Sequence, residues 1–251
     1  LNPGCRFFDK RIGQSTTLTG RTIVKHMSAE VNNVITGTYD HVGEAMIYGD
    51  TDSCYFSAWP ILKDDVNSGK LEWNIDKCIT LMDQVCEQAN TTFPEFMLKA
   101  FHCPKSRSDV IAAGREIVAQ SGLYITKKRY AALVVDNEGF RTDTDGKPGK
   151  VKAMGLDLRR SDTPVFMQQF LSEILLMVLT DIPQADVLER ITQFRQEFSE
   201  RPGWEKGSPK RANKVGHYQR LEQKQGKANM PGHVRASINW NTLKRMNGDK
   251  Y

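Results

Sequence analysis

The chain has 251 residues, of which 39% are hydrophobic and 26% charged, and its net charge is +5 at neutral pH. This composition is typical of a folded globular protein, and it excludes a disordered or collagen-like chain. It also excludes a membrane span, because the longest apolar run, residues 174–179, is far shorter than the ~20 residues that a bilayer requires. The five cysteines form no Cys-x-x-Cys pair, so we expect reduced thiols in a cytoplasmic protein rather than disulfides or a cysteine-rich zinc site.

The first predicted elements are a helix and a hairpin. An apolar stripe at helical spacing predicts a helix over residues 15–34. After a turn at residues 37–43, residues 45–48 and 53–56 are expected to be strands, because the intervening glycine and aspartates favour a tight turn. The expected hairpin therefore carries two carboxylates at its tip.

A second helix is predicted over residues 75–101, interrupted near Pro94 because proline lacks a backbone N–H. Strands are expected at residues 110–118 and 123–135, followed by a polar loop at residues 137–150. The pattern then changes, with predicted helices over residues 164–180 and 185–200 and a basic, irregular stretch after them. We place a domain boundary near residue 155, between an α+β domain and a mainly helical one.

Basic residues are concentrated at the C-terminal end. Residues 201–251 hold 12 Lys and Arg against three acids, whereas residues 1–100 are net acidic. A polyanion partner would explain this asymmetry. A solvated basic surface without a partner is the alternative.

The segment Tyr48-Gly49-Asp50-Thr51-Asp52-Ser53 is the motif that most directly suggests chemistry. Proteins hold Mg²⁺ with carboxylates, which are hard oxygen ligands. Two such ions can bind the attacking and leaving oxygens of a phosphoryl transfer. By residue type alone, however, an Asp-x-Asp pattern is more often only a turn.

This segment resembles motif C of family B (alpha-like) DNA polymerases, and the pattern is closest to the T-even-type bacteriophage replicative enzymes. Other elements resemble the family in the same order along the chain, namely Thr19-Gly20-Arg21, Arg115-Glu116-Ile117, Lys127-Lys128-Arg129-Tyr130, Ser161-Asp162-Thr163-Pro164 and Pro231-Gly232-His233-Val234-Arg235. The resemblance implies an α+β fold in which residues 1–155 form the C-terminal part of a polymerase palm, an antiparallel sheet with packed helices. Residues 156–251 would form an incomplete, mainly helical thumb.

The resemblance also implies roles for single residues. Asp50 and Asp52 would be catalytic, metal-binding carboxylates on a turn shaped by Gly49 and Thr51, and Glu116 would add a metal contact. The phage relatives carry an aspartate where this chain has Gly114, which weakens that auxiliary site. The expected DNA contacts are Lys127, Lys128, Arg129 and Tyr130 near the primer end, and Arg159, Arg160, Lys210, Arg211 and Lys214 on the thumb. The implied cofactor is a pair of Mg²⁺ ions, and the implied substrates are primer-template DNA and a deoxynucleoside triphosphate.

The sequence contains no recognisable motif A aspartate, motif B helix or exonuclease, and Asp50 and Asp52 alone would repel each other. We therefore expect the isolated chain to be inactive. Three interpretations compete: a piece of a longer polymerase, as a first residue other than methionine suggests; a natural split subunit that needs a partner chain; and a non-catalytic module that binds duplex DNA. A metal-dependent nuclease is a more distant fourth. We favour the first, acting in the cytoplasm of an infected host cell.

Overall fold

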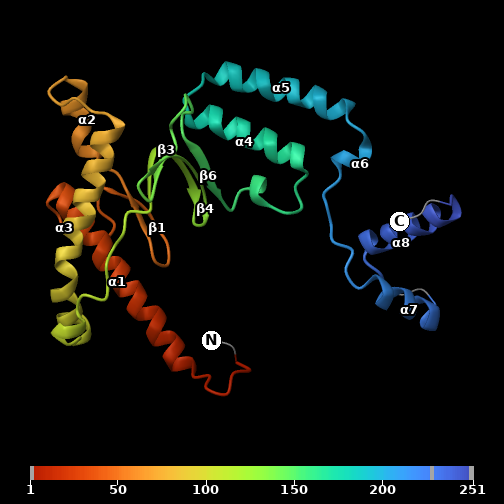
Figure 1. The fold of residues 1–251 in the computed structure, drawn as a ribbon, viewed down its shortest axis with the longest axis horizontal. Coiled ribbons are helices and arrows are strands. Elements are labelled where there is room, and N and C mark those ends of the chain that lie inside the picture. Colours follow the sequence, from red (N-terminus) through yellow and green to blue (C-terminus); the bar gives the residue numbers. More distant parts are fainter. Residues whose placement is uncertain (1–2, 227–228, 249–251) are drawn as a thin grey trace. The chain divides into compact units, whose positions relative to one another are not determined.

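The computed structural model describes residues 3–226 and 229–248, and it divides into two compact units (Figure 1). The first comprises Leu1–Leu156 with Ser172–Val187, and the second comprises Asp157–Leu171 with Leu188–Tyr251. The fold is α+β, as the sequence predicted, with antiparallel sheets in the first unit.

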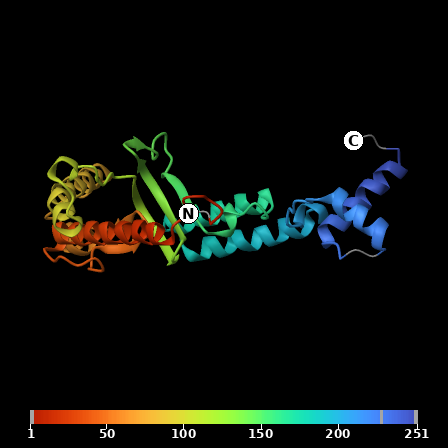
Figure 2. The ribbon, with the colours of Figure 1, turned by 90° about the horizontal axis from the view of Figure 1, so that it is seen from below.

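Two long helices, α1 (Lys10–Thr36) and α3 (Ile75–Phe101), lie side by side in the first unit (Figure 1 and Figure 2). The side chain of Asp9 caps α1 by accepting a hydrogen bond from the Arg11 N–H, and Gly37 ends the helix with a φ of 76°. Val31 of α1 and Val85 and Ala89 of α3 form the buried core between the helices. The predicted first helix is therefore confirmed but longer, and a short helix, α2 (Trp59–Asn67), was not predicted.

Helix α3 continues through Pro94, so the predicted interruption is wrong. A proline inside a helix costs about 3 kcal/mol, because it removes a hydrogen bond and crowds the preceding turn. Phe93 and Met97 lie on either side of it and are both buried. Burial of such side chains contributes roughly 1.5–3 kcal/mol each, which offsets the cost of the proline.

The predicted hairpin is present. Strands β1 (Met46–Gly49) and β2 (Cys54–Phe56) pair antiparallel, and Gly49 lies opposite Cys54. The N–H of Asp50 donates to the carbonyl of Ser53 over 3.0 Å, which closes the turn. The fold thus places both aspartates at the tip of the hairpin.

A second sheet follows in the first unit, with strands β3 (Ile117–Thr126), β4 (Arg129–Asn137), β5 (Phe140–Arg141) and β6 (Lys150–Met154). Strand β4 is central, because β3, β5 and β6 all pair with it antiparallel. Its residues Ala131 and Leu133 are buried against Leu179, which lies at the end of helix α4 (Val165–Leu179).

The strand predictions for this sheet are partly wrong. Residues 110–116 are irregular, and a turn at Lys127-Lys128 divides the expected strand 123–135 into the ends of β3 and β4. Lys128 adopts a φ of 62°, a turn conformation that residue preferences do not indicate for lysine. Lys127 and Lys128 therefore project from a turn and do not alternate along a strand.

The second unit contains the first half of α4 and most of α5 (Gln184–Glu200), which pack through Phe166, Phe170, Phe194 and Phe198. The chain after residue 201 is not irregular, because it forms α6 (Gly203–Lys206), α7 (Val215–Gln225) and α8 (Gly232–Met246). Helix α7 was not predicted, although its half-buried side chains Val215, Tyr218 and Leu221 recur at helical spacing. The described parts of the chain also include two short 3-10 turns, Lys105–Arg107 and Asp157–Arg159.

Within the described ranges, no helix is both long enough and apolar enough to cross a membrane.

Candidate metal and nucleic-acid site

Asp50 is held by hydrogen bonds within its own turn and by a lysine that is distant in the sequence. Its Oδ1 accepts hydrogen bonds from the Thr51 N–H at 2.8 Å and the Thr51 hydroxyl at 3.2 Å. The Tyr48 hydroxyl donates to Oδ2 at 3.3 Å, and Lys128 Nζ lies 3.7 Å from Oδ1. The Thr51 backbone N–H is the largest of the effects that lower the pKa of Asp50, with Lys128 and Tyr48 acting in the same direction. The carboxylate is therefore ionised at neutral pH and well supplied with protein donors.

Asp52 has a different environment. It is exposed, and within the described part of the chain its carboxylate has no hydrogen-bond or ion-pair partner. It lines a cavity in the first unit together with Thr51 and Glu116. Of the two aspartates on the turn, Asp52 is the one whose oxygens are available to a cation.

Glu116 is paired with a lysine from the second sheet. Lys152 Nζ on β6 lies 2.6 Å from Glu116 Oε1, and the Glu116 side chain is 58% exposed. Among the residues that the structure describes, no group of three or more His, Cys, Asp or Glu side chains is close enough together to hold a metal ion. A metal at this edge would need ligands in addition to Asp52 and Glu116.

The basic turn between β3 and β4 lies next to the aspartate turn. The Lys128 N–H donates to the Tyr48 hydroxyl over 2.9 Å, although the two residues are 80 positions apart. Lys127, Lys128 and Arg129 are exposed, whereas Tyr130 is buried and shares a 2.8 Å hydroxyl–hydroxyl hydrogen bond with Tyr55. Three basic side chains of this motif thus reach the surface, and its tyrosine belongs to the core.

The basic residues predicted for the thumb lie in the second unit, and an acid engages some of them. Asp162 Oδ1 lies 3.0 Å from Arg160 Nε, and its Oδ2 lies 2.7 Å from Lys210 Nζ. Arg160 and Lys210 together hold the pKa of Asp162 far below its usual range. Arg159, Arg211 and Lys214 are exposed, and Lys214 directly precedes α7.

The cavity beside Asp52 is largely apolar and is bounded by two strand edges. Its walls come from α1, α3, β2 and β3, with side chains such as Ile23, Met27, Met82 and Phe93. In the described sheets, β2 pairs only with β1 and β3 pairs only with β4. Both strands therefore present unpaired backbone groups beside an apolar space.

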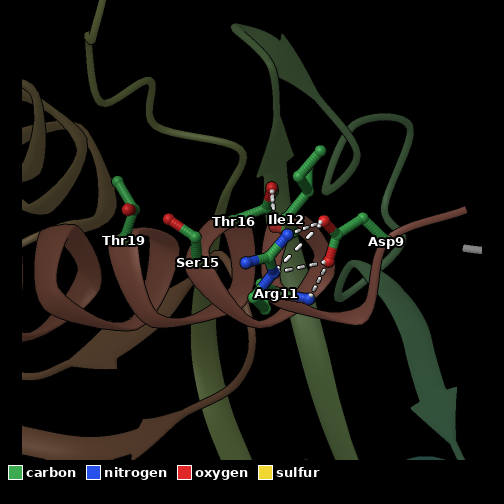
Figure 3. A pocket seen from close by; sticks show the side chains of 6 residues that line it. All are labelled: Asp9, Arg11, Ile12, Ser15, Thr16 and Thr19. Atoms are coloured by element: carbon green, nitrogen blue, oxygen red, sulfur yellow. Dashed lines mark hydrogen bonds and ion pairs between the residues drawn. The ribbon is translucent and has the colours of Figure 1, made fainter. Parts of the chain in front are cut away.

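A second hollow lies at the start of α1 and offers no comparable chemistry (Figure 3). Arg11 folds back on Asp9 with a 2.8 Å ion pair, and the Thr16 hydroxyl donates to the Ile12 carbonyl over 3.0 Å. The charged groups of Asp9 and Arg11 and the Thr16 hydroxyl therefore already have partners within the start of the helix.

Sequence reasoning missed the aromatic cluster that connects the two turns. Tyr48, Tyr55, Tyr124 and Tyr130 have mutual ring-centroid separations between 5.4 and 5.9 Å. It also did not predict that the backbone of Gly155, at the expected domain boundary, lies against the Lys128 carbonyl. The tyrosines are visible in the sequence as residues of β-prone segments, but no local signal brings segments so far apart together.

Comparison with known proteins identifies two similar phage proteins. No protein-family model matches the chain. It is 28% identical over 186 residues to the DNA-directed DNA polymerase of Escherichia phage RB69, which covers 70% of this chain and 20% of that protein. It is 24% identical over 214 residues to the DNA-directed DNA polymerase of Enterobacteria phage T4, covering 77% and 22% respectively. The resemblance to T-even-type phage polymerases is therefore confirmed, and the chain spans about a fifth of the length of these relatives.

Proposed function

We propose that this chain is a piece of a family B DNA-directed DNA polymerase, with the C-terminal part of the palm in residues 1–155 and an incomplete thumb in residues 156–251. The observation that carries the proposal is the contact between two distant motifs. The turn that bears Asp50 and Asp52 lies against the Lys127-Lys128 turn, with 3.7 Å between Lys128 Nζ and Asp50 Oδ1. A cation-binding group and a phosphate-binding group side by side suit chemistry at the end of a DNA strand.

The donor groups fit Mg²⁺ only in part. Asp52 offers hard carboxylate oxygens for which the described ranges supply no protein partner, and Glu116 lines the same cavity, whereas Asp50 is already engaged. Bound Mg²⁺ would supply charge stabilisation for nucleotidyl transfer, with Asp52 as the main ligand from this chain and Asp50 close to it. Lys127, Lys128 and Arg129 would bind the primer backbone, and Arg159, Arg160, Lys210, Arg211 and Lys214 would follow the duplex.

The natural split subunit remains the second candidate, because one feature favours a missing polypeptide partner. The edges of β2 and β3 face an apolar cavity beside Asp52. A further strand carrying another carboxylate would pair with those edges and complete the metal ligands. Whether that strand belongs to the same polypeptide or to a partner chain, we expect the present chain alone to lack polymerase activity.

Complementation of primer extension tests this proposal. The chain would be assayed with Mg²⁺, primer-template DNA and deoxynucleoside triphosphates, alone and with a polypeptide that supplies the remaining polymerase regions. We expect extension only in the mixture, and its loss in Asp52→Asn. Asp64→Asn, an exposed aspartate on α2, serves as the matched control and should retain activity. Robust extension by the chain alone, or equal activity of both variants, would contradict the proposal.

The third candidate, a non-catalytic DNA-binding module, predicts a different pattern. Duplex binding would survive Asp50→Ala combined with Asp52→Ala, and no complementing polypeptide would restore extension. In each interpretation in which the chain binds DNA, its affinity for the duplex should fall steeply between about 50 and about 200 mM salt. Binding releases counterions from the DNA phosphates, and added salt opposes that release. Affinity that does not change with salt would contradict a role for the basic residues.

A further inference from the structure

We propose that Tyr48 is a positioning residue that fixes the Lys127-Lys128 turn against the aspartate turn, so that the primer-binding lysines and the turn that bears Asp50 and Asp52 keep one relative arrangement. This inference rests on the proposed function and deepens it. It assigns to Tyr48 a role that acts through its two neighbours, the Lys128 backbone and the Asp50 carboxylate. The role follows from the contacts of a single hydroxyl group.

The Tyr48 hydroxyl connects the two turns, because it accepts one hydrogen bond and donates another. It accepts one from the Lys128 backbone N–H at 2.9 Å and donates one to Asp50 Oδ2 at 3.3 Å. A phenol can donate once and accept at the same time, so both capacities are used here. Phenylalanine would keep the ring and lose both contacts.

The lysine turn needs such a contact because its backbone is strained. Lys128 has a φ of 62°, a left-handed conformation that costs an L-residue roughly 1–2 kcal/mol. The Tyr48 hydrogen bond holds its N–H on one side. On the other side the Gly155 backbone packs so closely that a Cβ there would lie 2.0 Å from the Lys128 carbonyl oxygen. The turn is thus held from both sides in a conformation that it would not favour alone.

The ring of Tyr48 packs against three other tyrosine rings. Its centroid lies 5.7 Å from those of Tyr55 and Tyr130 and 5.9 Å from that of Tyr124. Burial raises the pKa of Tyr124 to about 12, so this part of the cluster stays neutral. A fixed ring gives the hydroxyl a fixed place, which is the requirement for a positioning residue.

The chain offers a matched control for the test. Tyr55→Phe also removes one hydroxyl from the same cluster, but that hydroxyl bonds to Tyr130 and touches neither turn. We would compare the 251-residue wild type with Tyr48→Phe and Tyr55→Phe by three measurements: exchange of the Lys128 amide hydrogen by NMR, melting temperature, and affinity for duplex DNA.

We expect the Lys128 amide to exchange about fivefold faster or more in Tyr48→Phe, as the loss of one hydrogen bond implies. Duplex affinity should fall by several-fold in that variant only, while its melting temperature should decrease no more than that of Tyr55→Phe. Unchanged Lys128 exchange or unchanged DNA affinity in Tyr48→Phe, or equal effects of both variants on either of these two measurements, would overturn the inference. If the wild type binds no duplex DNA, the proposed function fails, whereas the exchange comparison still decides whether Tyr48 holds the turn.

Discussion

Gly155 shows how a residue without a side chain can set the place of a charged turn. It follows β6 and has a φ of 65°. Its backbone lies so close to the Lys128 carbonyl oxygen that a Cβ added to Gly155 would be 2.0 Å from that oxygen. The Arg129 guanidinium donates to its carbonyl over 3.1 Å. Backbone conformation and close approach therefore both require glycine at this position.

Gly155→Ala should destabilise the protein more than the backbone conformation alone explains. The matched control is Gly146→Ala, since Gly146 has a φ of 74° and a Cβ added to it would meet no atom within 4 Å. Both variants incur the left-handed strain, but only Gly155→Ala adds a clash with backbone, which typically costs about 1–3 kcal/mol. We expect thermal unfolding of Gly155→Ala several degrees below that of Gly146→Ala. Equal melting temperatures would show that the Lys128 turn moves away freely.

At the scale of elements, His26 connects α1 to α3. Its ring stacks on Phe96 with 3.8 Å between centroids. Its Nδ1 lies 2.8 Å from the Tyr39 hydroxyl, and its Nε2 lies 3.0 Å from the Thr92 hydroxyl. Burial is the largest effect on its pKa and lowers it below the ordinary value of 6.5, while the charge of Glu30 acts in the opposite direction. The packing of the two helices thus favours a neutral imidazole.

Stability should therefore depend on pH through His26. Because the folded-state pKa lies below the unfolded one, the unfolded chain binds more protons between the two values. The contribution is fully present above the ordinary pKa of 6.5 and is lost as the pH falls toward the folded-state pKa. Melting temperatures measured from about pH 8 to about pH 5 should decrease toward acid, and His26→Gln should reduce that slope. His41→Gln, at an exposed histidine, should leave the slope unchanged; a slope that is the same in all three proteins would refute the assignment.

How far the sequence predicts these elements depends on how local their causes are. The β1–β2 hairpin was predictable because Gly49, Asp50 and Asp52 encode the turn themselves. The continuation of α3 through Pro94 was not, because burial against other elements decides it. The Lys127-Lys128 turn was missed for a similar reason, since partners 80 positions earlier and 27 positions later hold Lys128 in place. The aspartates of the candidate site were thus visible in the sequence, whereas the contacts that join the two turns were not.

At the scale of the whole molecule, the edges of β2 and β3 beside an apolar cavity are a liability for a chain on its own. Unpaired strand edges next to apolar surface favour pairing with another chain. In the proposed polymerase, further polypeptide would cover them. In the isolated chain, a second copy is the available partner.

We accordingly expect concentration-dependent association in analytical ultracentrifugation. Ala119→Lys would place a charge on β3 where it lines the cavity, and it should reduce the association. Ile125→Lys is the control, because Ile125 lies on the same strand, is exposed and does not line the cavity. A monomer at all concentrations, or the same effect of both variants, would argue against association through this edge.

The cavity walls also contain three thiols, those of Cys54, Cys78 and Cys86. Burial raises the pKa of Cys54 to about 11 and raises the pKa values of the other two. Since only a thiolate attacks an alkylating reagent, these cysteines should react slowly at neutral pH, while the exposed Cys5 has no such shielding. The alkylation rates of these three cysteines would therefore report how often the cavity between β2 and β3 opens to solvent. A second copy of the chain or a further polypeptide bound at these strand edges would slow them.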